Sequence, residues 1–303
     1  MNNLTLKQLR YVQALAQTGH FGRAADLCAI SQPALSLQIK EVEDHLGFAL
    51  FERDTRQVRL TSFGADFVAR ARDILRSVQD LEDFARSEKG NVLSRLRMGI
   101  IPTIAPYLLP ALVSALKRQT HDIDIHVRET LTPRLIEDLA QGRIDTAIVA
   151  LPVSEPSFEE TPLFTERFVF VRPKSDDGKP VPSVKMLQEM RLLLLEEGHC
   201  FRDQALAFCN ITLRRPRETL DGSSLATLVQ MVDAGLGVTL IPEMAVSVET
   251  RSASVSIIPF DAPEPTRTIG MIWRKSNPLA PAFRTLSELV SDTAQALRAH
   301  PKH

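Results

Sequence analysis

A single long helix divides this chain into two parts of different character. After Thr61, a favourable N-cap residue, a helical pattern runs without a break to about Lys89, and Gly90 ends it. Its apolar positions alternate in steps of four and three residues, the spacing of a coiled-coil seam: Phe67, Ala71, Ile74, Val78, Leu81 and Ala85. The seam predicts a dimer through residues 61–90; the alternative is a lone amphipathic helix packed on its own domain.

Three short helices are predicted before this linker. Residues 6–19 carry apolar side chains at helical spacing, and residues 21–28 place small alanines where two helices approach closely. Ser31 is predicted to cap a third helix, with Pro33 in its first turn, where a missing N–H is tolerated. The expected inner stripe is Ala34, Leu35, Ile39, Val42 and Leu46, and the expected outward residues are Gln32, Ser36, Gln38 and Lys40. This is the pattern of a helix-turn-helix whose last helix enters the major groove.

The stretch that follows predicts a two-stranded wing. Residues 47–53 and 55–61 alternate, with Arg53 and Arg56 near the tip, where arginines contact phosphate or the minor groove. A polar helix face is by itself often only a solvated surface. Residues 1–60 hold seven basic and six acidic side chains, so DNA binding must depend on where the charges are placed.

Strand and helix patterns alternate from residue 95 onward. They predict a βαβαβ unit with a parallel sheet, formed by residues 96–101, 106–117, 123–129, 133–141 and 146–150. A second such unit is predicted between about Phe164 and Phe260, after which residues 268–273 and 281–299 return to the first. Two lobes with two crossings enclose a cleft. Thr103 and Thr132 each follow a strand, where ligands of open α/β sheets bind, although either is alone more typical of a helix cap.

Two cysteines nine residues apart predict a redox switch. Cys200 stands between His199 and Arg202, and nearby positive charge favours the reactive thiolate. Cys209 follows an apolar run and is expected to be buried. If the segment between them is helical, the two Cα atoms lie about 14 Å apart, whereas a disulfide needs less than about 7 Å. Oxidation would therefore unwind the segment.

Other interpretations of the cysteines are weaker. Free cysteines are often small buried hydrophobes, as we expect for Cys28. Metal binding is not favoured, because the three cysteines and seven histidines show no ligand spacing. The N-terminus lacks the pattern of a signal peptide and no apolar run is long enough for a membrane span, which predicts a cytoplasmic protein without membrane contact.

The order of helix-turn-helix, wing and linker helix closely resembles the LysR-type transcriptional regulators. Residues 21–28 and the run Ser31-Gln32-Pro33-Ala34-Leu35-Ser36 carry this resemblance. The run Gly198-His199-Cys200-Phe201-Arg202-Asp203-Gln204 with Cys209 resembles the peroxide-sensing OxyR branch of that family. The resemblance implies a winged helix-turn-helix domain (1–60), a linker helix (61–90) and a regulatory domain (91–303) similar to periplasmic binding proteins. Lobe I is expected at 91–163 and 268–303, and lobe II at 164–267.

The resemblance also implies roles for residues and partners. Cys200 would attack hydrogen peroxide, held by Thr103, Thr132 and His199 with Arg202 and Asp203 in the same site, and Cys209 would close the disulfide. Arg267, which precedes the returning strand, is expected to join this site and to raise the positive potential near Cys200. The residues expected to contact promoter DNA of antioxidant genes are Ser31, Gln32, Pro33, Ser36, Gln38, Lys40, Arg53 and Arg56. The implied partners are a second copy, a tetramer, RNA polymerase and a thiol reductant system, with no cofactor.

Three alternatives remain open. A LysR-type regulator can respond to a small organic anion in the cleft, with both cysteines incidental. A thiol peroxidase would turn over peroxide, against which the DNA-reading half argues. A solute-binding protein would not carry a helix-turn-helix.

Overall fold

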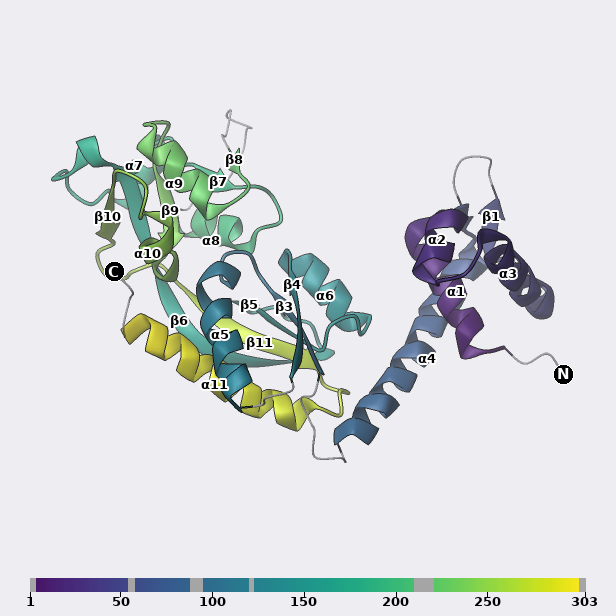
Figure 1. Ribbon diagram of the computed structural model, residues 1–303. Coiled ribbons are helices and arrows are strands. Elements are labelled where there is room, and N and C mark those ends of the chain that lie inside the picture. Colours follow the sequence, from purple (N-terminus) through teal and green to yellow (C-terminus); the bar gives the residue numbers. More distant parts are fainter. Residues whose placement is uncertain (1–3, 54–57, 88–94, 120–122, 210–220, 300–303) are drawn as a thin grey trace. The chain divides into compact units, whose positions relative to one another are not determined.

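The computed structural model describes residues 4–53, 58–87, 95–119, 123–209 and 221–299, and it divides into two compact units, Met1–Ala85 and Arg86–His303 (Figure 1). Among the described residues, no helix combines the length and hydrophobicity that a membrane crossing requires. The elements of the first unit are α1 (Leu6–Thr18), α2 (Phe21–Leu27), α3 (Gln32–Leu46), β1 (Phe51–Arg53), β2 (Val58–Leu60) and α4 (Ser62–Ser87).

Local signals set the helix ends in the first unit. Thr5 caps α1 through a capping box, and Gly19 ends it in the left-handed region at φ 59°. The Ser31 hydroxyl accepts from the backbone N–H of Ala34 at 3.4 Å, which confirms the predicted cap of α3. Strands β1 and β2 form the predicted antiparallel hairpin, and the Thr61 hydroxyl caps α4 by accepting from Gly64 N–H at 2.8 Å.

The predicted inner stripe of α3 is correct except at Ala34. Leu35, Ile39 and Val42 are fully buried against α1 and α2, whereas Ala34 is exposed. At about 100° of rotation per residue, Ala34 lies about a third of a turn away from the centre of this stripe. It therefore belongs to the outward face of α3.

The second unit begins with the predicted parallel βαβαβ arrangement. Strand β3 (Arg95–Ile100) pairs in parallel with β4 (Asp124–Glu129) and β5 (Thr146–Leu151), and the connecting helices are α5 (Ala105–Gln119) and α6 (Thr132–Ala140). The elements that follow are β6 (Phe158–Pro173), η1 (Lys174–Asp176), α7 (Val184–Glu189), β7 (Leu194–Leu195), α8 (Cys200–Phe208), β8 (Asp221–Gly222), α9 (Leu225–Asp233), β9 (Thr239–Pro242), η2 (Glu243–Ala245), α10 (Val246–Glu249), β10 (Val255–Pro259), β11 (Thr266–Arg274) and α11 (Ala280–Ala299).

Two long strands connect two hydrophobic cores in this unit. The main sheet has the order β10-β6-β11-β5-β3-β4, with β9 also paired to β6. We call the part around the core of β3, β5, β11 and α11 lobe I, and the part around the core of α7, α8, α9 and β9 lobe II. The predicted crossings between the lobes, at 163/164 and 267/268, fall inside β6 and β11. Figure 1 shows α11 beside α5 on lobe I.

Lobe II is only in part the second parallel unit that the sequence predicted. Strand β7 pairs in parallel with β8, and Leu192 just before it forms a parallel bridge with Val238, whereas β9 and β10 both pair antiparallel to β6. The reason is that β6 runs on from lobe I as one strand of 16 residues, so that the later strands of lobe II pair with it instead of starting a new sheet.

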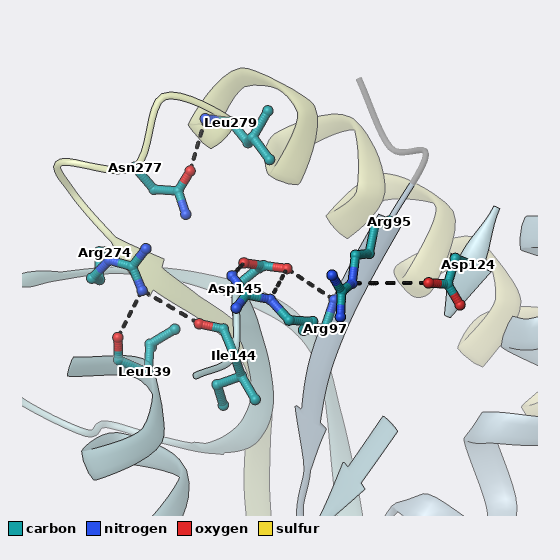
Figure 2. Close-up of polar contacts among 9 residues, drawn as sticks. All are labelled: Arg95, Arg97, Asp124, Leu139, Ile144, Asp145, Arg274, Asn277 and Leu279. Atoms are coloured by element: carbon teal, nitrogen blue, oxygen red, sulfur yellow. Dashed lines mark hydrogen bonds and ion pairs between the residues drawn. The ribbon is translucent and has the colours of Figure 1, made fainter. Parts of the chain in front are cut away.

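At the end of lobe I opposite the carboxyl ends of β3 and β4, arginine side chains form hydrogen bonds that connect neighbouring strands and loops (Figure 2). The backbone and guanidinium N–H groups of Arg97 donate to the Asp145 carboxylate, which links the start of β3 to the start of β5. Arg274 Nη1 donates to the carbonyl oxygens of Leu139 and Ile144 at 2.8 and 3.3 Å. These bonds fix the sheet whose opposite end carries Thr103 and Thr132.

Candidate functional site

The two predicted threonines lie at the carboxyl ends of neighbouring parallel strands. Thr103 follows β3 and is 3% exposed. Thr132 follows β4 and is the first residue of α6, and its Oγ1 is buried with no hydrogen-bond partner in the described part of the chain. A buried hydroxyl normally has a partner, so this one is available to a small bound molecule.

Cys200 is the first residue of α8, directly after His199 at the N-cap. Its half-buried side chain packs against the core of lobe I, although α8 belongs to lobe II. Gly198, with φ 93°, allows the loop before α8 to approach lobe I closely, because a Cβ there would lie 2.9 Å from Leu131 Cδ1. Since Leu131 precedes Thr132, the fold brings the Cys200 loop to the start of α6.

A buried ion pair lies next to Phe201, the residue that follows Cys200. Arg267 and Glu166, both with fully buried side chains, are 2.6 Å apart from Nη2 to Oε1. Arg267 Nη1 donates to Thr103 Oγ1 at 2.8 Å, and Nη2 donates to the Thr103 carbonyl at 3.1 Å. The guanidinium also lies over the ring of Phe201, 5.4 Å from its centre. Arg267 therefore contacts a predicted threonine of lobe I and the residue that follows Cys200.

The source of positive potential at Cys200 differs from the prediction. Burial lowers the pKa of the His199 imidazole, against the opposing effect of Glu196, so His199 is neutral at pH 7 and supplies no charge. Arg202 donates to the Leu195 carbonyl at 2.6 Å and pairs with Asp221 at 2.9 Å, which fastens α8 to β7 and β8. The N-terminus of α8, where Cys200 lies, adds the positive end of a helix dipole.

The other proposed peroxide-site residue on α8, Asp203, is exposed. Gln204, one helical turn after Cys200, was not predicted as a site residue, yet its Oε1 is buried without a hydrogen-bond partner among the described residues. Its spacing of four from Cys200 places both on one face of α8, a signal that the sequence does contain. Glu166 was also missed, because no local pattern marks a carboxylate that a distant arginine neutralises.

Cys209 ends α8 inside the core of lobe II. It is completely buried, and burial raises the pKa of its thiol to about 11, so it is protonated at neutral pH. The segment between the two cysteines is helical, so about 14 Å separates their Cα atoms. The two thiols contact different hydrophobic cores, one in each lobe.

The predicted DNA-reading residues lie mainly on the outer face of α3. Ser31, Gln32, Pro33 and Lys40 are exposed, and Ser36 and Gln38 are half-buried. Gln38 Nε2 donates to Glu41 Oε2 at 2.7 Å. Arg56 and the side chain of Arg53 lie outside the described residues.

The predicted seam of α4 is partly uncovered. Ile74 and Leu81 are 47% and 66% exposed, Phe67 and Val78 are half-buried, and Ala71 is buried within the chain.

Two family models match the chain. One, described as "Bacterial regulatory helix-turn-helix protein, lysR family", matches residues 6–65, and the other, described as "LysR substrate binding domain", matches residues 89–295. The chain belongs to the LysR family of bacterial regulators. The two family models therefore cover both the DNA-binding unit and the two-lobed regulatory part of this LysR-type regulator.

Its relatives in the OxyR branch match over nearly their full length. The hydrogen peroxide-inducible genes activator of Haemophilus influenzae is 37% identical over 97% of this chain and 98% of its own length. A full-length OxyR variant from Pseudomonas aeruginosa has a TM-score of 0.75 at 39% identity, covering 96% of this chain and 95% of that one. A hydrogen peroxide-bound OxyR mutant from Corynebacterium glutamicum has a TM-score of 0.67 at 33% identity, covering 98% and 94%.

Proposed function

We propose that this regulator senses hydrogen peroxide by oxidation of Cys200 and transmits the signal to promoter DNA of antioxidant genes. The observation that carries the proposal is the position of Cys200 at the start of α8, near Thr132 and Gln204, whose buried side-chain oxygens have no hydrogen-bond partner among the described residues. The relatives support it, because one is named for peroxide-inducible genes and another holds hydrogen peroxide.

The polar groups around the thiol match the needs of a peroxide molecule. Hydrogen peroxide has two O–H donors and two acceptor oxygens. Thr132 Oγ1 and Gln204 Oε1, which no described residue hydrogen-bonds, can accept its protons. Because Arg267 already donates to Thr103 Oγ1, the hydroxyl proton of Thr103 is free to point at a peroxide oxygen. Neutral His199 is a further donor or acceptor beside Cys200. In this proposal Arg202 does not bind peroxide but anchors α8 through Leu195 and Asp221, and Asp203 lies on the exposed surface of α8.

The chemistry requires no cofactor. The Cys200 thiolate forms an S–O bond with one peroxide oxygen while the O–O bond breaks, and the other oxygen leaves as hydroxide and takes a proton to become water. The resulting sulfenic acid then reacts with the Cys209 thiol: an S–S bond forms, the S–O bond breaks, and the hydroxyl leaves with the Cys209 proton as water. Peroxide is reduced by two electrons, which the two thiols supply.

The disulfide changes the shape of the regulatory part. Closing it brings together Cα atoms that are about 14 Å apart in the helix, so α8 must unwind and one sulfur must leave its core. Unwinding also moves Phe201 away from Arg267, whose other contacts reach β6 and Thr103. We propose that the altered lobe surface changes how copies pair, and thus the spacing of their DNA-reading helices.

The remaining assignments belong to the same proposal. Copies pair along α4 into dimers and assemble into tetramers on DNA, which α3 and the wing contact. The oxidised form recruits RNA polymerase, and a thiol reductant system of the cytoplasm restores the thiols. The peroxide step occurs once per signal, so the protein acts as a regulator rather than an enzyme.

Mass spectrometry after stoichiometric hydrogen peroxide tests this function. The wild type and a Cys28→Ser control are expected to form a Cys200–Cys209 disulfide within seconds, whereas Cys200→Ser forms none. Thiols that remain reduced in the wild type would contradict the proposal.

A specific observation favours a second candidate, a regulator that responds to a small organic molecule. A groove of about 1170 Å³ is lined by residues of both lobes, among them Tyr107, Met244 and Arg251, and its lining does not include Thr103, Thr132 or Cys200. This candidate predicts that Cys200→Ser leaves gene induction intact.

A further inference from the structure

An exposed apolar patch lies on the outer face of the recognition helix. Leu37 is 57% exposed in the middle of α3, and Pro33 and Ala34, one turn earlier, are exposed as well. Three apolar residues thus share one face of the N-terminal half of α3. We call Pro33, Ala34 and Leu37 the outer patch.

The described residues of the first unit leave the outer patch exposed. The neighbours of Leu37 one turn toward the C-terminus, Lys40 and Glu41, are exposed like those one turn before it. The core side of α3 is formed instead by Leu35, Ile39 and Val42. A single exposed leucine is common on protein surfaces and needs no explanation, but this one occupies the face that a helix-turn-helix presents to DNA bases.

We propose that Leu37 reads the 5-methyl group of thymine in the major groove. Each base pair presents a distinct pattern there, and thymine alone among the four standard bases presents a methyl group, which apolar side chains contact. Ser36 and Lys40 flank Leu37 and are suited to polar and phosphate contacts. The neighbouring amide of Gln38 donates to Glu41 Oε2 and is half-buried, whereas Leu37 is 57% exposed.

This inference rests on the DNA-binding role of α3 and is independent of peroxide sensing. It assigns a specificity determinant: a Leu37 contact favours A·T pairs at one position of each half-site. A second copy of the chain is the other possible occupant of the outer patch, and the experiment below separates the two.

The test uses a DNA duplex that the purified full-length protein selects from a random pool. Each thymine of that duplex is then replaced in turn by deoxyuridine, which lacks only the methyl group. For the wild type, one position per half-site is expected to lose about fourfold in affinity, the effect of one methyl group removed from water. For Leu37→Ala, the thymine and deoxyuridine duplexes are expected to bind equally at that position.

Two controls make the result specific. Leu27→Ala removes another exposed leucine, in α2, and is expected to retain the wild-type sensitivity to deoxyuridine. Placing 5-methylcytosine at the sensitive position tests whether the methyl group itself is read, and wild-type affinity is expected to exceed that for cytosine. Alanine is favourable in a helix, so Leu37→Ala is expected to fold.

The inference is overturned if no thymine shows methyl dependence in the wild type, or if Leu37→Ala retains it. It is also overturned if Leu37→Ala changes the oligomeric state while deoxyuridine has no effect, since the outer patch then contacts a second copy. If no duplex is selected at all, the DNA-binding function itself fails.

Discussion

The guanidinium of Arg267 and the carboxylate of Glu166 form a fully buried ion pair between the two strands that cross from one lobe to the other. The two residues face each other in the β6–β11 register. Arg267 reaches Thr103 and the ring of Phe201, and Glu166 Oε2 accepts from the backbone N–H of Met244 at 3.3 Å. One pair therefore joins the candidate peroxide site to both lobes.

Removing one charge of this pair should destabilise the regulatory part. In Glu166→Gln the Arg267 charge stays buried without its counter-ion, and we expect a loss of about 3–5 kcal/mol in the free energy of unfolding. Urea unfolding followed by the fluorescence of Trp273, the single tryptophan, which is buried in lobe I, measures this loss.

The matched control is Glu264→Gln. Its carboxylate pairs with partly exposed Arg167 at 3.4 Å, so a change of no more than about 1 kcal/mol is expected. Equal losses in the free energy of unfolding for the two substitutions would show that the buried Arg267–Glu166 pair contributes no more to stability than the partly exposed pair.

Thr132→Val should slow the reaction with peroxide without destabilising the fold. The hydroxyl that it removes has no partner among the described residues, so its loss leaves no protein group unsatisfied, while the bound peroxide loses one hydrogen bond. We expect the rate of Cys200 oxidation by peroxide to fall about tenfold. Stopped-flow measurements with hydrogen peroxide in excess over the protein give this rate.

The matched control is Thr146→Val, for which we expect the opposite outcome: lower stability and an unchanged oxidation rate. Its hydroxyl donates to the Ile272 carbonyl at 2.9 Å in lobe I, so we expect about 1 kcal/mol of lost stability and an unchanged oxidation rate. An unchanged rate in Thr132→Val would remove this threonine from the peroxide site.

The buried thiol of Cys209 makes stability depend on alkaline pH. Burial raises its pKa to about 11 in the folded chain, whereas an unfolded cysteine titrates near about 8.5. As pH rises, the unfolded chain loses this proton first, so the contribution of the thiol is complete below about pH 8.5 and is lost as pH approaches about 11. Wild-type stability should therefore fall more steeply across this window than that of Cys209→Ala. Parallel curves would show that the Cys209 proton is not retained in the folded state.

The exposed residues of the α4 seam predict an effect on assembly. Leu81→Asp places a charge in the proposed dimer contact and should shift the protein toward monomers in analytical ultracentrifugation. Ala69→Asp, on the exposed opposite face of α4, should leave the association unchanged. Dissociation of both variants, or of neither, would argue against pairing along this seam.

The parts of the fold that depend on local pattern were predictable. Apolar periodicity and capping residues gave the helix-turn-helix and the wing hairpin, and strand–helix alternation gave the parallel sheet of lobe I. Ala34 was misplaced because a small apolar residue tolerates both faces of a helix.

The parts that depend on contacts between distant residues were not predictable. Nothing near β9 or β10 in the sequence indicates that both pair antiparallel to β6. Likewise, the bond from Arg267 to Glu166 joins residues about a hundred positions apart. His199 was expected to be charged because the sequence does not reveal its burial.

Hydrogen exchange of α8 before and after one equivalent of hydrogen peroxide tests the central claim most directly. The account predicts that the amides of α8 are protected in the reduced protein and exchange rapidly once the Cys200–Cys209 disulfide has formed, whereas Cys200→Ser shows no change. Retained protection of α8 in a protein shown to carry the disulfide would contradict the claim that oxidation unwinds this helix.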